Sequence, residues 1–189
     1  MQLEALRRRL QERQALRYQG PADRRAAVAA VLRPAADGPE LLLIRRAERE
    51  GDPWSGHMAL PGGHADASDP DLLATARRET REEVGLDLEA HELLGVLDEH
   101  AAHAQGRFTG LVIAPYVFAL RSHAEPQPNH EVAELLWAPL GPMARGELDA
   151  VKELRRDGQL VSFPGFEVAG HVVWGLTHRV LQNLFSALG

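Results

Sequence analysis

The stretch from Gly62 to Leu86 reads GGHADASDPDLLATARRETREEVGL. Asp69 followed by Pro70 is typical of a helix N-terminus, because aspartate caps free backbone N–H groups and proline fits the first helical position. Gly85 stands where a glycine commonly ends a helix in the left-handed conformation. The stretch therefore predicts a loop that begins with two glycines and a helix from about Pro70 to Val84.

Three glutamates lie on one face of this predicted helix. Glu79, Glu82 and Glu83 are spaced i, i+3 and i+4, so their side chains point the same way. Like charges at this spacing cost roughly a few tenths of a kcal/mol per pair, and a bound cation reverses that cost. Mg²⁺ takes carboxylate oxygens together with water and phosphate oxygens. The glutamates are therefore candidate ligands for Mg²⁺, with Mn²⁺ as an alternative, while the competing interpretation is a solvated surface helix.

The residues around the glutamates favour the cation interpretation. Arg78 lies one turn before Glu82 and can orient that carboxylate through an i to i+4 ion pair. The adjacent Gly62 and Gly63 allow backbone to approach a ligand closely, and a glycine carbonyl is a further hard oxygen ligand. The joint pattern of glycines and carboxylates is more specific than either part alone.

The remaining chain predicts a mixture of strands and helices around this central helix. In the first part of the chain we expect an amphipathic helix within residues 1–20 and paired strands over 26–32 and 41–44. After the central helix we expect a hairpin with strands over 93–97 and 111–120 that are joined by a long polar connection, then a strand over 135–138, a helix over 139–156, and short strands over 160–163 and 166–168. A closing helix contains Val173, Thr177, Val180, Leu181, Leu184 and Leu188. This order predicts an α/β sandwich in a single domain over residues 1–189.

Composition narrows the classes of function. The 189 residues are 44% hydrophobic and 25% charged, as in ordinary globular proteins. The net charge of −6 argues against nucleic-acid and anionic-membrane partners. The absence of cysteine excludes disulfides, zinc-thiolate sites and cysteine nucleophiles. The charged N-terminus is unlike a signal peptide and no run of about 18 apolar residues occurs, so we expect no membrane span and a cytoplasmic location.

The glycines, arginine and glutamates together resemble the Nudix box, which is glycine, five residues, glutamate, seven residues and then Arg-Glu-apolar-x-Glu-Glu-x-Gly-apolar. The second half matches from Arg78 to Leu86, with Thr80 at the apolar position. In the first half, five residues separate Gly63 from Asp69, but eight separate Asp69 from Arg78. The loop is thus one residue longer, and Asp69 or Asp71 must replace the glutamate that orients the arginine in the family.

A branch of this family that acts on coenzyme A has a similar lengthening. It also has an upstream Leu-Leu-Thr-x-Arg-Ser/Ala pattern that leads through Arg and Gly to Phe-Pro-Gly-Gly. The chain resembles this branch at Leu42, Leu43, Arg46, Ala47, Gly56, Pro61, Gly62 and Gly63. It departs at Ile44, Leu60 and Gly51, which replace threonine, phenylalanine and the second arginine, and in a longer spacing to Gly56. Arg49 is a candidate substitute for that arginine. The resemblance extends over roughly residues 25 to 185.

The resemblance implies a Nudix-type α/β/α sandwich with a mixed sheet, preceded by an N-terminal helix. It implies hydrolysis of the diphosphate bond of coenzyme A or its derivatives to 4'-phosphopantetheine and adenosine 3',5'-bisphosphate. Glu79 and Glu83 are then the direct metal ligands, assisted by Glu82 and the Gly62 carbonyl, and Arg78 is the orienting residue. Glu79 or Glu82 can also serve as general base. Glu131 and Glu134, from a later loop, are rivals for that role.

Candidate substrate contacts cluster near the glycine loop and are Arg45, Arg46, His57 and Gly63. Alternation along a strand places Arg45 and Arg46 on opposite faces, so at most one should reach the substrate. Trp54 is a candidate loop anchor or adenine stack, whereas Trp174 is expected in the core. The predicted partner is a small-molecule nucleotide, and the oligomeric state stays open. The alternatives are hydrolysis of ADP-ribose, a dinucleotide or a damaged nucleotide, and a non-catalytic nucleotide-sensing module.

Overall fold

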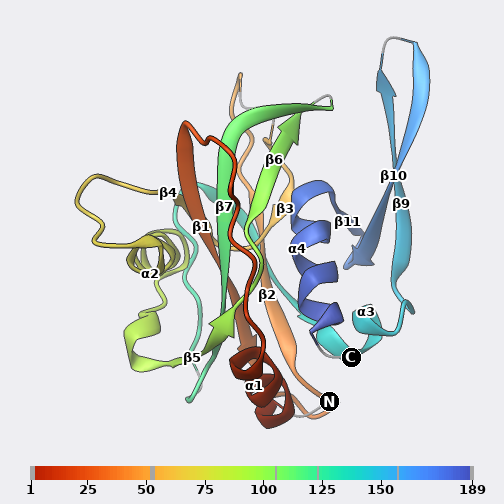
Figure 1. Cartoon of the computed structure of the whole chain (residues 1–189). Coiled ribbons are helices and arrows are strands. Elements are labelled where there is room, and N and C mark those ends of the chain that lie inside the picture. Colours follow the sequence, from red (N-terminus) through yellow and green to blue (C-terminus); the bar gives the residue numbers. More distant parts are fainter. Residues whose placement is uncertain (1–2, 52–53, 105, 123, 157, 188–189) are drawn as a thin grey trace.

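The computed structural model describes residues 3–51, 54–104, 106–122, 124–156 and 158–187. A mixed β-sheet lies between helix α2 (Leu72–Val84) on one face and helix α4 (Gly175–Ser186) on the other, as Figure 1 shows. This arrangement confirms the predicted α/β sandwich. Within the described ranges, no helix combines the length and apolar composition that crossing a bilayer requires.

The central sheet has the strand order β3-β2-β1-β7-β5, with β4 paired to β1, β6 to β7 and β8 to β2. Strands β1 and β7 run parallel, and the other pairs among these strands are antiparallel. The strands are β1 (Arg24–Arg33), β2 (Glu40–Arg46), β3 (Met58–Ala59), β4 (Gly62–His64), β5 (Glu92–Val96), β6 (His100–Ala104), β7 (Arg107–Ala119) and β8 (Val132–Pro139). The predicted pairing of 26–32 with 41–44 and of 93–97 with 111–120 is therefore confirmed.

Apolar side chains alternate between the two faces of this sheet, because successive residues of a strand point to opposite sides. In β1, Ala30 and Leu32 join the cluster that includes Leu181 of α4. Ala29 and Val31 join the cluster on the opposite face, which includes Ala76 and Val84 of α2. Both faces of β1 are thus covered, which explains its continuous apolar sequence.

Helix α2 begins two residues later than predicted. Its N-cap is Asp71, whose side chain accepts a hydrogen bond from the Ala74 backbone N–H at 2.8 Å. The predicted cap, Asp69, instead binds Arg78 and Thr75, so its carboxylate is not available to the helix end. The helix ends as predicted at Gly85, which adopts the left-handed conformation with φ 68°.

The opening helix α1 (Leu3–Glu12) is shorter than the predicted segment of residues 1–20. Leu6 and Leu10 are buried, but Leu16 lies beyond the helix and is 69% exposed. The chain leaves the helix because other partners satisfy its backbone: Leu16 N–H donates to the Asp98 carboxylate at 2.8 Å, and Tyr18 N–H donates to Glu99 at 2.9 Å.

The region after β8 departs most from prediction. The predicted helix over 139–156 is wrong, since only α3 (Leu140–Ala144) is helical and strand β9 (Asp149–Arg156) follows. The two predicted short strands around Pro164 are one strand, β10 (Gln159–Val168). Residues 149–156 pair continuously with 159–166, so cross-strand contacts override the local helical pattern.

Strand β11 (His171–Trp174) completes a second sheet in the order β11-β10-β9, and the ribbon of β9 and β10 extends past α4 in Figure 1. Val173 lies in this strand and not in the closing helix, which begins at Gly175. Leu188, the last residue of the predicted helical pattern, lies outside the described residues.

The polar connection predicted between β5 and β7 also contains structure. Strand β6 lies within this connection and includes His100 and His103. Outside the connection, the short 3₁₀ helix η1 (Leu88–Ala90) precedes β5. Strand β7 is 13 residues long, so its first half pairs with β6 and its second half with β5.

Candidate active site

Strand β4 brings the two glycines against helix α2. The Gly62 N–H donates to Oε2 of Glu83 at 2.8 Å. Gly62 has a φ of 147°, and a Cβ there would collide with the Ala27 carbonyl and the Val28 backbone. Only glycine fits this position without strain, so steric constraints require glycine at the position whose N–H binds Glu83.

Gly63 provides space for the carboxylate of Glu79. A Cβ at Gly63 would lie 2.5 Å from Cδ of Glu79, closer than real Cβ atoms approach other heavy atoms. The absence of a side chain therefore sets the position of this carboxylate beside the loop. Glu79 and Glu83 lie next to successive glycines of the same short strand.

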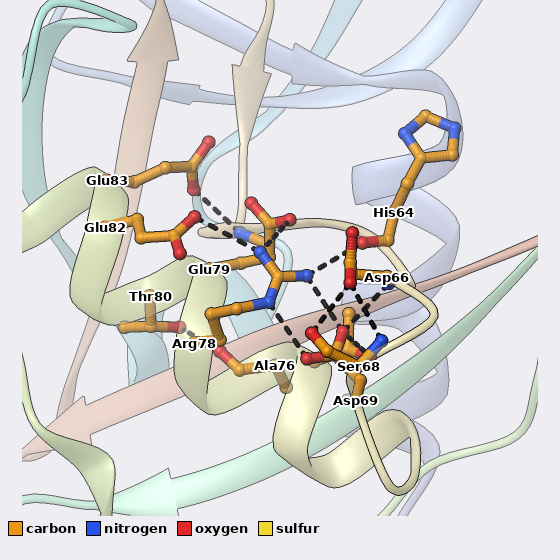
Figure 2. A network of polar contacts seen from close by, with 12 residues as sticks. His64, Asp66, Ser68, Asp69, Ala76, Arg78, Glu79, Thr80, Glu82 and Glu83 are labelled. Atoms are coloured by element: carbon orange, nitrogen blue, oxygen red, sulfur yellow. Dashed lines mark hydrogen bonds and ion pairs between the residues drawn. The ribbon is translucent and has the colours of Figure 1, made fainter.

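Arg78 lies at the centre of a polar network in which all of its N–H groups are used, as Figure 2 shows. Nε and Nη2 donate to the two oxygens of Asp69, both at 2.9 Å. Nη1 donates to Glu79 at 2.8 Å and to Glu82 at 3.1 Å, and Nη2 also donates to the His64 carbonyl at 3.0 Å. The guanidinium thus ties the loop to the helix and restrains two of the three glutamates.

Asp69 is the residue of the lengthened loop that pairs with Arg78. Its bidentate hydrogen bonds from Arg78 hold its pKa well below the usual range, and the Thr75 hydroxyl donates a further bond at 2.8 Å. Of the two candidate substitutes for the family's orienting glutamate, Asp69 contacts Arg78, whereas Asp71 caps the helix. The extra loop residue thus leaves a carboxylate in contact with the arginine.

Glu83 is the most buried of the three glutamates, with 3% of its surface exposed. Its pKa is raised to about 7, first by burial and then by repulsion from Glu79 and Glu131, against the opposing effects of the Gly62 N–H and the Arg46 guanidinium. The negatively charged form of Glu83 is therefore unfavourable when no cation is bound. A nearby cation would reverse that preference.

Glu82 differs from its neighbours because its side chain is 53% exposed and its carboxylate binds Arg78 through one oxygen. No described residue donates a hydrogen bond to its other oxygen.

The loop after β7 packs on the end of α2 and approaches the same carboxylates. Asn129 N–H donates to the Glu83 carbonyl at 2.8 Å, and the Asn129 side chain accepts from Glu131 N–H at 2.7 Å. The Glu131 carboxylate pairs with Arg49 at 2.7 Å and lies close enough to Glu83 to raise its pKa. Arg49 and Glu131 therefore border the glutamate cluster together.

The predicted substrate residues separate in the structure. Arg46 lowers the pKa of Glu83 and thus faces the cluster, whereas Arg45 pairs with Glu134 at 3.2 Å. Glu134 also binds Nε2 of His171 at 3.1 Å. The ring of His57 lies against Trp174, and the His57 carbonyl accepts from the Arg46 N–H at 3.0 Å.

Two contacts of this region follow from no local pattern in the sequence. The His64 contact to Arg78 uses a backbone carbonyl, which carries no sequence pattern of its own. The contact between His171 and Glu134 joins β11 to β8, and their separation of 37 positions gives no local spacing to read.

The carboxylates fit a divalent cation, although among the described residues no three acidic or imidazole groups already converge on one point. Hard cations such as Mg²⁺ take one or two carboxylates together with water and phosphate oxygens, so a preformed cage is not required. Burial, and then repulsion from Glu79 and Glu131, raises the pKa of Glu83, so its charged form is unfavourable and a bound cation would relieve that cost. Glu79 and Glu83 stay the predicted source of the donor oxygens.

The fold and this site define an α/β sandwich that carries a glycine loop and a carboxylate helix. Residues 23–156 match the family model described as the NUDIX domain, which is more than half of the chain. The chain therefore belongs to the Nudix family, whose members hydrolyse diphosphate bonds and generally use divalent metal ions.

Curated relatives from three organisms extend over most of the chain. A protein of Schizosaccharomyces pombe described as uncharacterized is 37% identical, covering 82% of the chain. The match spans only 47% of the length of that relative. A Citrobacter koseri protein named Nudix hydrolase NudL is 34% identical, covering 80% of the chain and 76% of the relative. The Homo sapiens protein named mitochondrial coenzyme A diphosphatase NUDT8 is 31% identical, covering 87% of the chain and 70% of the relative.

Solved structures share the fold. A MutT/nudix family protein from Enterococcus faecalis has a TM-score of 0.53 at 17% identity, covering 99% of this chain and 68% of that one. An Ap4A hydrolase of C. elegans has a TM-score of 0.52 at 23% identity, covering 65% of this chain and 84% of that one.

Proposed function

We propose that the protein hydrolyses the diphosphate bond of coenzyme A or its derivatives, giving 4'-phosphopantetheine and adenosine 3',5'-bisphosphate. The observation behind this proposal is the lengthened loop. Despite the extra residue, Asp69 of this loop binds Arg78 through both carboxylate oxygens, so the loop stays tied to the helix. A similar lengthening marks the branch of the family that acts on coenzyme A. The similarity to the human protein named coenzyme A diphosphatase supports the same substrate.

Glu79 and Glu83 would hold the metal ion, with Glu82 and the Gly62 carbonyl assisting, and Mg²⁺ is the expected ion with Mn²⁺ as the alternative. When bound, a divalent cation supplies charge stabilisation at the phosphoryl oxygens and activates water for attack on phosphorus. Gly62 N–H holds one oxygen of Glu83, which leaves the other oxygen for the ion.

The other residues of the network orient this set. Arg78 restrains Glu79 and Glu82 from one side and is itself held by Asp69. Gly63 leaves room for the Glu79 carboxylate. Arg46 lies on the side of Glu83 and would meet a phosphate oxygen of the substrate. Positioned charges of this kind lower the barrier because they need little rearrangement during reaction.

Glu82 is our choice for the general base. It is the most exposed of the three glutamates and has only one oxygen bound to Arg78. Its rival Glu131 also acts on Glu83 but is paired with Arg49 at 2.7 Å. Separate Glu82→Gln and Glu131→Gln variants distinguish them, because the base variant loses kcat steeply and the other keeps most of it.

Kinetics with Mg²⁺ on coenzyme A, ADP-ribose, a dinucleoside polyphosphate and an oxidised nucleotide test the substrate. We expect coenzyme A to have the highest kcat/KM, with the two named products in equal amounts. Faster turnover of ADP-ribose than of coenzyme A would reject the proposal. A non-catalytic nucleotide sensor is the alternative from another class, and no turnover of any compound with Mg²⁺ or Mn²⁺ would favour it.

The expected cytoplasmic location is also a proposal. The human relative carries the word mitochondrial in its name, so cell fractionation of the organism's own protein is the direct test.

A further inference from the structure

Three aromatic rings from separate elements form a row beside the site. His57 directly precedes β3, Phe163 lies on β10, and Trp174 ends β11. The ring centroids of His57 and Trp174 are 4.9 Å apart, and those of Phe163 and Trp174 are 5.3 Å apart. Both separations lie in the range of favourable aromatic contacts.

The strand register places two of these rings on one face of the second sheet. Trp174 is opposite Gly165, and Phe163 precedes Gly165 by two positions, so both side chains stand on the same face. Gly165 has no side chain to separate them, and a Cβ there would lie 2.6 Å from the Val173 carbonyl. Lys152 is opposite Phe163 and shares this face.

This aromatic row is not part of the hydrophobic core. Phe166 of the same strand is 1% exposed and belongs to a core cluster, together with Val168. Phe163 and Trp174 are only half-buried and belong to none of the apolar clusters of the described residues, which corrects the expectation that Trp174 lies in the core. Both rings also lie beyond residue 156, where the match to the family model ends.

One hydrogen bond links the His57 end of the row to a residue that acts on the carboxylate site. The His57 carbonyl accepts a hydrogen bond from Arg46, whose guanidinium acts on Glu83. Gly62 follows His57 by five positions, which limits their distance to about 18 Å of extended chain. Lys152 forms no ion pair with any residue that the structure describes, so its ammonium group is available for an anion.

We propose that Phe163 and Trp174 bind the adenine ring of the substrate by stacking, and that Lys152 binds the phosphate on its ribose. The inference rests on the proposed function, because it requires an adenine nucleotide whose diphosphate lies at Glu79 and Glu83. Planar rings suit a base better than the flexible pantetheine chain, and a lone cation matches the additional phosphate of a 3'-phosphorylated adenosine.

The stack is tested by calorimetric titration with adenosine 3',5'-bisphosphate. A chelator is present, so the measured Kd does not depend on a metal ion or on hydrolysis. We expect Phe163→Leu to raise Kd about tenfold through loss of stacking, and Phe163→Tyr to retain the affinity. Leu160→Ala is the matched control, because Leu160 is on the same strand, is 58% exposed and points to the opposite face. An unchanged Kd in Phe163→Leu, or an equal loss in Leu160→Ala, would overturn the stack.

Two further titrations locate the ends of the substrate. Lys152→Met should weaken adenosine 3',5'-bisphosphate about fivefold but leave 5'-AMP unchanged, since an exposed ionic contact contributes modestly. Phe163→Leu should leave the Kd of 4'-phosphopantetheine unchanged. Weaker binding of 4'-phosphopantetheine, with unaltered binding of the bisphosphate, would assign the row to the other end and reject the inference.

The outcome is separable from that of the proposed function. If wild-type protein hydrolyses coenzyme A and Phe163→Leu keeps its KM, the function stands and the stack fails. If another adenine nucleotide is the substrate and Phe163→Leu raises its KM with kcat unchanged, the stack stands and coenzyme A is rejected.

Discussion

The loop and helix of residues 62–86 and the ribbon of residues 149–168 show two different ways in which this chain is ordered. In the first region, polar groups from the loop, the helix and β1 constrain one another, and Arg78 alone makes five hydrogen bonds. In the second, β9 and β10 pair with each other while Val151 and Leu160 remain 59% and 58% exposed. A substitution in the first region should therefore disturb several groups, whereas one at the ribbon tip should disturb few.

Glu83→Gln should have the largest effect. The amide can still accept the Gly62 hydrogen bond but cannot bind a cation as a carboxylate does, so we expect kcat to fall by about 10³-fold or more. The melting temperature should stay the same or rise at pH 8, because a buried charge beside Glu79 is removed. Steady-state kinetics with Mg²⁺ and thermal unfolding measure the two effects.

Glu82→Gln provides a matched comparison for this substitution on the same helix. Its side chain is exposed, so its effect on stability should be small whatever its catalytic role. Full activity of Glu83→Gln would refute the assignment of Glu83 as a metal ligand.

Gly63→Ala should have the next largest effect. The added Cβ would displace the Glu79 carboxylate, and a shift of about 1 Å at a catalytic group can cost about 10²-fold in rate. Stability should change little, because the displaced atoms are the end of a flexible side chain. A double-mutant cycle with Glu79→Gln tests the cause, since the two losses should not add. Additive losses would show that Gly63 acts through something other than Glu79.

Asp69→Asn should have a moderate and pH-dependent effect. Pairing with Arg78 lowers the pKa of Asp69 in the folded protein, so this stabilisation is present above the ordinary value of 3.8 and is lost as the pH falls below it. At pH 7 we expect the melting temperature to fall by about 4 °C and activity by about tenfold, because Arg78 loses a charged partner.

Thermal unfolding of both proteins from pH 7 downwards checks this linkage. The difference between wild type and Asp69→Asn should be constant from pH 7 to pH 5 and shrink below pH 3.8. A difference that vanishes already between pH 7 and pH 5 would assign the effect to a different group.

The same contrast explains what the sequence could predict. The helix, its glycine end and the grouping of Glu79, Glu82 and Glu83 follow from local spacing, which a helix converts directly into a common face. Which aspartate pairs with Arg78 could not be predicted, because the loop between Gly63 and Leu72 has no repeating geometry. The role of each site residue stays a proposal, as does the single domain over residues 1–189.

The errors lie where distant pairing decides the structure. Asp149 to Arg156 contains helix-compatible residues, and only its ladder with β10 makes it a strand. His100 and His103 lie in the connection predicted to be polar and irregular, but the long β7 offers an edge to which they pair. Likewise, the helix ends at Glu12 because Asp98 and Glu99, some eighty positions away, take the backbone N–H groups of Leu16 and Tyr18.

Leu160→Thr should have the smallest effect and tests the other side of the comparison. Threonine suits a strand as well as leucine does, and Leu160 is 58% exposed, so we expect the melting temperature to change by less than about 1 °C. Phe166→Leu in the same strand is the reference, because that ring is 1% exposed and its truncation should lower the melting temperature by about 4 °C or more. A loss at Leu160 as large as the loss at Phe166 would mean that the ribbon tip is covered in solution, and the contrast between a constrained site and a free ribbon would then fail.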